Sequence, residues 1–259
     1  MTGARLSLLG LAALALAFAV GSGSWHPGAA ARAAAGCRTE IFEGVEFAVC
    51  TARAGDDLRL FLNDAAGEPI ATFERLAEIA AAEGARLVFA MNAGMYHPDR
   101  RPVGLYLEQG QQIGGLVTAP GPGNFGLLPN GVFCIAADRF AVLESRRYAR
   151  ERPDCRYATQ SGPMLVLGGR LHPRFMRQSA SRHVRNGVGV SADGRRAEFV
   201  ISGSAVNFHL FARFFRDRLR LPDALYFDGK VSRLYAPEIG RADFGLPMGP
   251  MVGLLAAAE

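Results

Sequence analysis

The sequence predicts an α+β fold, in which a mixed β-sheet core is covered by a few packed helices in a single domain. Short apolar runs bounded by turn residues recur along the chain, and the 31 glycines and 14 prolines are scattered between them. Only two clear segments have helical periodicity, whereas a doubly wound sheet would need more helices. With 259 residues, of which 49% are hydrophobic, the chain can build one substantial core.

Residues 1–35 are expected to lie outside this domain. Arg5 precedes an apolar stretch over residues 8–20, and small residues at 33–35 offer a cleavage site. This order is typical of an export signal, and the apolar stretch is short for a membrane span. We therefore predict a signal peptide and linker over 1–35, a domain over 36–259, and a periplasmic or secreted protein without stable membrane insertion after cleavage. An uncleaved N-terminal anchor is the alternative.

The four cysteines all follow the predicted signal, and an even number in an oxidising compartment favours two disulfides. Three pairings are possible. The most local one, Cys37–Cys50 with Cys134–Cys155, is favoured, and buried free thiols are the alternative. A zinc site is not expected, because no C-x-x-C spacing occurs.

The strands and helices follow from apolar periodicity and turn residues. Strands are predicted over residues 40–51 (a hairpin turning at Gly44), 58–62, 87–91, 104–108, 111–117, 131–136, 139–143, 184–191, 197–202 and 224–227. One helix is expected over 72–83, where Gly84 ends it, and a second begins at Ser204 and ends at Pro222. The apolar C-terminus, 248–258, is expected to dock on the body of the domain.

Polar clusters with glycine end or interrupt several apolar runs. They are Asn92-Ala93-Gly94, Gln160-Ser161-Gly162, Arg185-Asn186-Gly187 and Asp228-Gly229. Glycine beside a polar side chain lets backbone N–H groups approach a ligand closely. An amide, a hydroxyl, a guanidinium and a carboxylate together suit an anionic, hydroxyl-rich ligand such as a sugar phosphate. The alternative is that each cluster is turn chemistry only.

Other classes of function find little support. The net charge of +5 is dispersed, and no basic run is interleaved with aromatic residues, so nucleic acid is not an expected partner. The sequence lacks the common hydrolase, zinc-protease, P-loop and EF-hand signatures. The histidines have no metal-ligand spacing and no metal is required, although Asp228 with amide oxygens could hold Ca²⁺ or Mg²⁺.

Several longer motifs resemble the phosphodiester glycosidase family. They are MNAGMY (91–96), PVGLY (102–106), GNF (123–125), PNGVF (129–133), ATQSGPML (158–165), RNGVGV (185–190), VNF (206–208), FARFFRD (211–217) and LYFDG (225–229). The resemblance runs from about residue 40 to the C-terminus. One branch of the family has Asn-Gly-Gly-Phe-Phe at the first motif and Asp-Gly-Gly-Gly-Ser at the last. Here Ala93, Lys230 and Val231 replace glycines, so a different substrate specificity is expected.

The resemblance implies an exported hydrolase of sugar-1-phosphodiesters in cell-envelope or exopolysaccharide metabolism, acting on a small-molecule or glycan phosphodiester. Arg185 is expected to bind phosphate, and Asp228 to serve as base, nucleophile or metal-binding carboxylate. Asn92, Gln160 and Ser161 are expected to position the reacting groups through hydrogen bonds. Gly94 and Gly229 are expected to contact the substrate, and Asn207 and His97 are secondary candidates for substrate binding.

A glycosidase pair needs a second carboxylate, for which Glu238 or Asp99 is the candidate. The alternative functions are a non-catalytic envelope protein that binds phosphorylated glycans and a disulfide-stabilised structural protein. Convergence of Asn92, Arg185 and Asp228 in space would favour a site.

Overall fold

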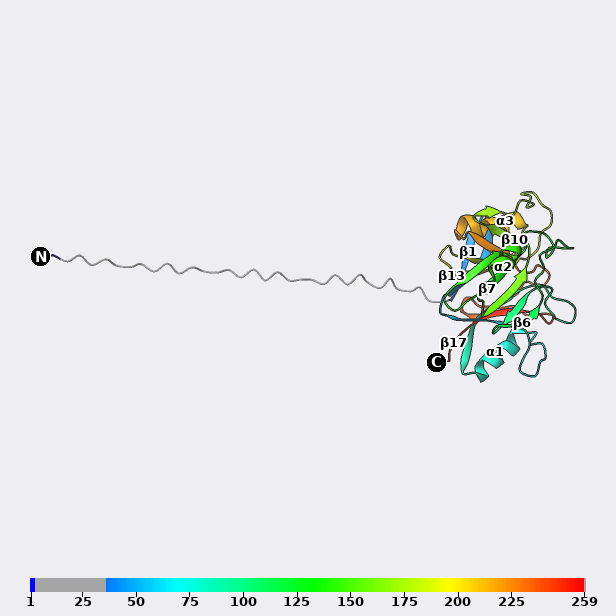
Figure 1. Cartoon of the computed structure of the whole chain (residues 1–259), viewed down its shortest axis with the longest axis horizontal. Coiled ribbons are helices and arrows are strands. Elements are labelled where there is room, and N and C mark those ends of the chain that lie inside the picture. Colours follow the sequence, from blue (N-terminus) through cyan, green and yellow to red (C-terminus); the bar gives the residue numbers. More distant parts are fainter. Residues whose placement is uncertain (3–35, 259) are drawn as a thin grey trace. The chain divides into compact units, whose positions relative to one another are not determined.

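The computed structural model describes residues 1–2 and 36–258, so the predicted signal peptide lies almost wholly outside the described residues. Residues Ala35–Glu259 make one compact unit, drawn in Figure 1. The α+β class is confirmed, because strands in three sheets are accompanied by a few short helices. Among the described residues, no helix is long and apolar enough to cross a membrane.

The elements alternate only in part along the chain. The strands are β1 (Gly36–Phe42), β2 (Val45–Arg53), β3 (Asp57–Phe61), β4 (Ala85–Asn92), β5 (Tyr106–Glu108), β6 (Gln111–Gly114), β7 (Gly131–Ile135), β8 (Phe140–Glu144), β9 (Tyr157–Ser161), β10 (Met164–Leu167), β11 (Arg170–Leu171), β12 (Asn186–Val190), β13 (Arg196–Ser202), β14 (Asp223–Tyr226), β15 (Leu234–Ala236), β16 (Arg241–Ala242) and β17 (Met251–Ala257). The helices are α1 (Phe73–Ala82), α2 (Ser145–Glu151), α3 (Phe208–Arg213), the π-helix η1 (Phe214–Arg218) and the 3₁₀-helix η2 (Pro237–Ile239).

The strand pairings correct one detail of the prediction. Every pairing between named strands within residues 36–258 is antiparallel, so the core holds three antiparallel sheets and not one mixed sheet. Their orders are β1-β2-β13-β12-β14-β10-β11, β16-β15-β4-β17-β3 and β6-β5-β9-β7-β8. Strand direction depends on connections that apolar periodicity does not encode.

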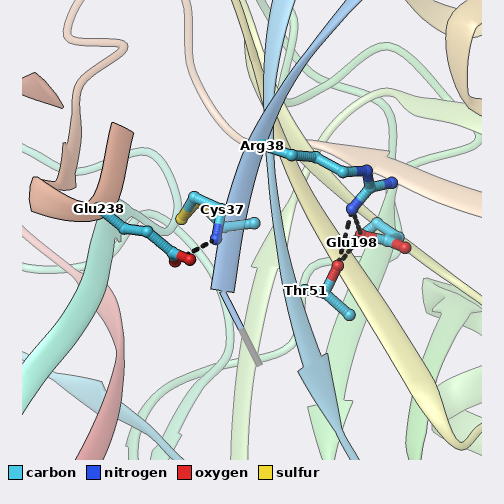
Figure 2. The surroundings of a disulfide bond; sticks show 6 residues. Cys37, Arg38, Thr51, Glu198 and Glu238 are labelled. Atoms are coloured by element: carbon cyan, nitrogen blue, oxygen red, sulfur yellow. Dashed lines mark hydrogen bonds and ion pairs between the residues drawn. A yellow bond between two sulfur atoms is a disulfide. The ribbon is translucent and has the colours of Figure 1, made fainter. Parts of the chain in front are cut away.

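The seven-stranded sheet begins with the predicted hairpin. Glu43 and Gly44 turn it with positive φ, and Cys37 lies opposite Cys50 in the register of β1 and β2. The disulfide Cys37–Cys50 confirms the favoured pairing. Figure 2 shows that Glu238 of η2 reaches this hairpin, where its carboxylate accepts a hydrogen bond from the Cys37 N–H at 2.9 Å.

The five-stranded sheet contains the C-terminus. As expected, the C-terminal segment docks, and β17 lies between β4 and β3. Helix α1 covers this sheet, since Phe73, Leu76 and Ala80 are buried in a cluster with side chains of β3, β4 and β17. The Thr72 side chain caps the helix by accepting a hydrogen bond from the Arg75 N–H.

The third sheet carries the second disulfide, Cys134–Cys155, which also confirms the favoured pairing. Helix α2 follows directly after β8 in this part of the chain, and the sequence did not predict it. The reason is local: only Ser145 of α2 is buried, so the helix has no apolar stripe that periodicity could detect.

The last long helical segment begins later than predicted. Ser204 was expected to open it, but Val206 is still paired in an isolated bridge with His183, and Asn207 caps the Leu210 N–H at 2.9 Å. The segment continues from α3 into η1, and buries Phe211, Phe214 and Phe215. In Figure 1, α3 and β10 lie at one end of the domain, and α1 and β17 lie at the other.

Candidate active site

Two sheets meet where β4 ends and β12 begins. Asn92 is the last residue of β4, Asn186 is the first of β12, and both side chains are fully buried. The Asn186 Nδ2 donates to the backbone oxygen of Asn92 at 2.9 Å and to its Oδ1 at 2.8 Å. Asn92 Oδ1 also accepts from the Arg233 N–H at 3.0 Å. The two amides therefore join the seven-stranded and five-stranded sheets.

The same junction fixes the backbone at Asp228. This residue follows the end of β14, and its N–H donates to Asn186 Oδ1 at 3.1 Å. The Ser161 hydroxyl donates to the Phe227 carbonyl at 2.8 Å, and the Ser232 hydroxyl donates to the Asp228 carbonyl at 2.5 Å. Two of the other predicted polar clusters, through Asn186 and Ser161, thus hold the main chain at Asp228 and Phe227.

The Asp228 carboxyl group is tied to its own loop on one side only. Its Oδ1 accepts hydrogen bonds from the Gly229 N–H at 2.5 Å and the Lys230 N–H at 2.9 Å. Its Oδ2 accepts no hydrogen bond from any residue in 36–258. Burial raises the pKa of Asp228 above its ordinary value, while these N–H groups and the Lys230 charge oppose that rise.

A surface pocket of about 420 Å³ opens beside Asp228. Its lining comes from four separated stretches of chain: Met95, Tyr96, Val103, Gly123, Asn124, His183, Tyr226, Asp228, Gly229 and Lys230. Burial raises the pKa of Tyr96, Arg100 opposes that rise, and the Asp228 charge adds to it. One carboxylate, one ammonium, an imidazole and two phenols therefore surround a volume that can hold a sugar with its phosphate.

Arg185 lies behind this pocket and not on its wall. Its guanidinium carbon is 3.6 Å from the centre of the Phe208 ring and 5.5 Å from that of Tyr226. It donates to the Val206 carbonyl at 2.9 Å and to the Ser181 carbonyl at 3.2 Å, whereas its Nη1 is buried without a partner among the described residues. Burial lowers the pKa of Arg185.

Tyr226 connects Arg185 with the pocket, since its side chain lines the pocket in front of the guanidinium. Burial raises the pKa of Tyr226, the Arg185 charge lowers it, and the Asp228 charge raises it further. A Cβ at position 229 would collide with the Tyr226 hydroxyl, so glycine is required there by the close approach of this phenol.

Gln160 and Gly94 serve the framework. Gln160 Oε1 accepts from the N–H groups of Leu105 and Val117, and its Nε2 donates to the Ser145 hydroxyl at 2.8 Å. Gly94 has φ 152°, and a Cβ there would lie 2.9 Å from the Thr159 hydroxyl oxygen. Both residues are buried and neither lines the Asp228 pocket, although Gly94 directly precedes Met95 of its lining.

The other candidates lie apart from Asp228. His97 is exposed in a turn, and Asn207 caps α3. Of the two candidate carboxylates, Asp99 is exposed and pairs with Arg101 at 2.6 Å, and Glu238 binds the Cys37 N–H (Figure 2). None of the four lines the Asp228 pocket. In residues 36–258, no group of three or more His, Cys, Asp or Glu side chains is arranged to hold a metal ion.

Several residues of the Asp228 pocket were not among the candidates that the sequence predicts. Tyr96, Tyr226 and Asn124 lie inside the family motifs, and Lys230 directly follows one. Their position in a motif was the signal that could have found them. His183 had no such signal, because an isolated histidine in a loop has no characteristic spacing.

Fold and site together define a disulfide-stabilised α+β domain with an acidic group in a pocket at the ends of its strands. The chain belongs to the phosphodiester glycosidase family, whose sequence model matches residues 85–241. The uncharacterized protein YigE of Escherichia coli (strain K12) is 36% identical over 178 residues, which cover 69% of each chain.

Solved structures that share the fold include the following three. The zebrafish N-acetylglucosamine-1-phosphodiester alpha-N-acetylglucosaminidase catalytic domain, auto-inhibited by its pro-peptide, superposes with a TM-score of 0.56 at 13% identity, and the match covers 84% of this chain and 81% of that one. A putative exported protein of Burkholderia pseudomallei superposes with a TM-score of 0.52 at 12% identity, and the match covers 82% of this chain and 74% of that one. A hypothetical protein from Synechocystis superposes with a TM-score of 0.51 at 16% identity, and the match covers 85% of this chain and 61% of that one.

Proposed function

We propose that the protein hydrolyses the bond between a sugar and the phosphate of a sugar-1-phosphodiester, with the substrate bound in the Asp228 pocket. The observation that carries this proposal is the Asp228 carboxyl group, whose Oδ2 has no hydrogen-bond partner in residues 36–258 and which lines a pocket large enough for a sugar phosphate. Membership of the phosphodiester glycosidase family supports the same class of reaction.

One carboxylate suffices for this chemistry. A phosphodiester is already a good leaving group, so the departing oxygen needs less protonation than in an ordinary glycoside. Asp228 acts at the anomeric carbon, where it adds as a nucleophile or takes a proton from water. In the same step the bond between the anomeric carbon and the phosphate oxygen breaks, and its electron pair leaves with the phosphate. If Asp228 is the nucleophile, water then hydrolyses the ester between the sugar and Asp228, which releases the sugar and restores the carboxylate. The anomeric configuration of the released sugar, followed by NMR, distinguishes these two roles.

The negative phosphate needs positive charge and donors near it. Lys230 and His183 line the pocket beside Asp228 and are proposed to hold the phosphate. Arg185, predicted as the phosphate ligand, is proposed to act as a positioning residue through Tyr226, since its guanidinium lies beneath that ring. Asn92, Ser161 and Asn186 fix the main chain of Asp228 from behind.

The direct test is release of free sugar from a panel of sugar-1-phosphodiesters by the purified protein. The panel varies the sugar and the group beyond the phosphate, because Lys230 and Val231 replace the glycines of one family branch. Turnover of at least one diester, with no turnover of the matched glycoside without phosphate, supports the proposal. Inactivity across the panel would count against it.

The pH dependence of kcat/KM should change when the charge near Asp228 is changed. Because the Lys230 charge lowers the pKa of Asp228, Lys230→Gln should raise that pKa further. Asp228 must be ionised to act as nucleophile or base, so the acid limb of kcat/KM should move to higher pH in this variant. Lys230→Arg keeps the charge and should leave the limb in place. An unchanged acid limb in Lys230→Gln would mean that the Lys230 charge does not lower the pKa of Asp228.

A second candidate function is binding of phosphorylated glycans without turnover. It is favoured by the Asp228 pocket, which is lined by a single carboxylate where glycosidases commonly place two. Calorimetric titration with the same diesters separates the two functions. Saturable binding without product over hours would favour the binding protein.

Residues 1–35 are proposed to direct export, so that the domain acts in the periplasm or outside the cell, on envelope or exopolysaccharide material. Two disulfides fit an oxidising compartment. Mass spectrometry of the protein from a periplasmic extract would give its N-terminal residue. Recovery of the intact chain only from the cytosol would contradict export.

A further inference from the structure

A second pocket, of about 200 Å³, lies beside α3, at the end of the domain where Figure 1 shows α3 and β10. Basic side chains dominate its lining, which consists of Glu43, Arg177, Arg182, Asn207, His209, Leu210 and Arg213. None of these residues lines the Asp228 pocket. The two pockets are nevertheless neighbours along the chain, because Arg182 lines one and His183 the other.

Part of the charge in this second pocket is already paired. Arg213 binds Glu43 at 2.6 Å and Asp217 at 2.9 Å, and Asp217 also binds Arg216. These two arginines and two carboxylates balance one another. Arg177 and Arg182 form no ion pair with any residue in 36–258, so two guanidinium charges at the pocket remain uncompensated.

His209 reports the resulting positive potential. Burial lowers its pKa, and the charges of Arg213, Arg177 and Arg216 lower it further, with only Glu43 acting in the opposite direction. The neighbouring arginines disfavour the charged form of His209, and an anion bound among them would offset this repulsion.

The loop that carries the arginines is held in place. The Asn207 Nδ2 donates to the Arg177 carbonyl at 3.0 Å and to the Ser179 carbonyl at 3.3 Å, while its Oδ1 caps α3. The Arg185 guanidinium donates to the Ser181 carbonyl of the same loop. Asn207, which the sequence suggested as a substrate residue, therefore fixes the backbone that presents Arg177 and Arg182.

We propose that this second pocket binds a phosphate group, with Arg177 and Arg182 as its principal ligands. Guanidinium groups bind phosphate oxygens through paired N–H donors, and the pocket volume accommodates a phosphate and the first atoms of what carries it. The group can be free phosphate or a phosphate on a glycan. The site is separate from the Asp228 pocket and does not depend on the function proposed for that pocket.

Titration of the complete mature domain, residues 36–259, with inorganic phosphate tests whether the second pocket binds phosphate. Calorimetry at low salt should give saturable binding that the double variant Arg177→Ala/Arg182→Ala weakens about tenfold or more, because two charge-assisted contacts are lost. The matched control is Arg86→Ala/Arg150→Ala, which removes the same charge from exposed positions elsewhere and should retain wild-type affinity.

NMR of the His209 ring supplies a local readout. Bound phosphate should raise the His209 pKa in the wild-type protein and leave it unchanged in the Arg177→Ala/Arg182→Ala variant. Glucose 6-phosphate in place of inorganic phosphate separates the two sources, because tighter binding of the sugar ester indicates a phosphorylated glycan as ligand. Equal phosphate affinity in wild type and double variant, or a His209 pKa insensitive to phosphate, would overturn the proposal.

Discussion

Replacement of Asp228 by asparagine should reduce turnover of a sugar-1-phosphodiester by about 10³-fold, with KM changed much less. In the proposed function the carboxylate reacts or moves a proton in the transition state, and removal of such a group typically costs roughly 10²- to 10⁴-fold in rate. Asparagine is close in shape, and its Oδ1 can still accept the hydrogen bonds from Gly229 and Lys230. Initial rates at saturating substrate give the comparison.

The same variant should fold at least as stably as the wild type at neutral pH. Burial raises the folded-state pKa of Asp228, so ionisation opposes folding, and stability falls as the pH rises from the ordinary value to the raised one. A neutral side chain escapes this loss. Urea unfolding gives the free energy of unfolding of both proteins. The control is Asp138→Asn: Asp138 is an exposed carboxylate beside Arg139, and its replacement should change neither turnover nor stability. An Asp228→Asn protein within tenfold of wild-type turnover would exclude Asp228 as the reacting group.

Replacement of Asn186 by alanine should destabilise the domain by about 3–5 kcal/mol, a large part of the stability of a typical domain. Its side chain donates to Asn92 and accepts from the Asp228 N–H, all in a fully buried position. Truncation leaves the Asp228 N–H and the Asn92 Nδ2 without their acceptor, Asn186 Oδ1, and each unpaired buried group costs about 1–3 kcal/mol. Chemical denaturation monitored by circular dichroism gives the free energy of unfolding.

Turnover should fall in Asn186→Ala as well, because Asp228 loses the amide that fixes its backbone. Asn63→Ala is the matched control: Asn63 is exposed, and its substitution should change stability by less than about 0.5 kcal/mol. A loss no larger in Asn186→Ala than in Asn63→Ala would mean that the amide pair does not hold the two sheets together.

Much of the framework could be predicted from sequence alone. Alternating apolar residues on both sides of Gly44 define the first hairpin, and the opposed positions of Cys37 and Cys50 within it make the local disulfide possible. The apolar run over 87–91 predicted a strand directly before Asn92, and β4 covers Ala85–Asn92. These features depend on neighbours in the chain, and local patterns are sufficient to specify them.

The failures share a physical cause. Helix α2 lacks an apolar face, and the start of α3 is delayed by the pairing of Val206 with His183 across the fold. The antiparallel direction of pairs that are distant in sequence, such as β2 with β13 and β4 with β17, follows from long-range connections. Periodicity within a window contains no information about such contacts.

The sequence by itself determined the family and the polar clusters that end apolar runs, with Asp228 and Asn92 among them. Only the tertiary structure decided their roles. It turned Asn92 inward to pair with Asn186, placed Arg185 beneath Phe208 and Tyr226, and left the Asp228 carboxylate in the pocket. Which face of a strand end points to solvent depends on how separate sheets pack. That packing minimises buried polar groups without partners over the whole chain, and no local segment can express it.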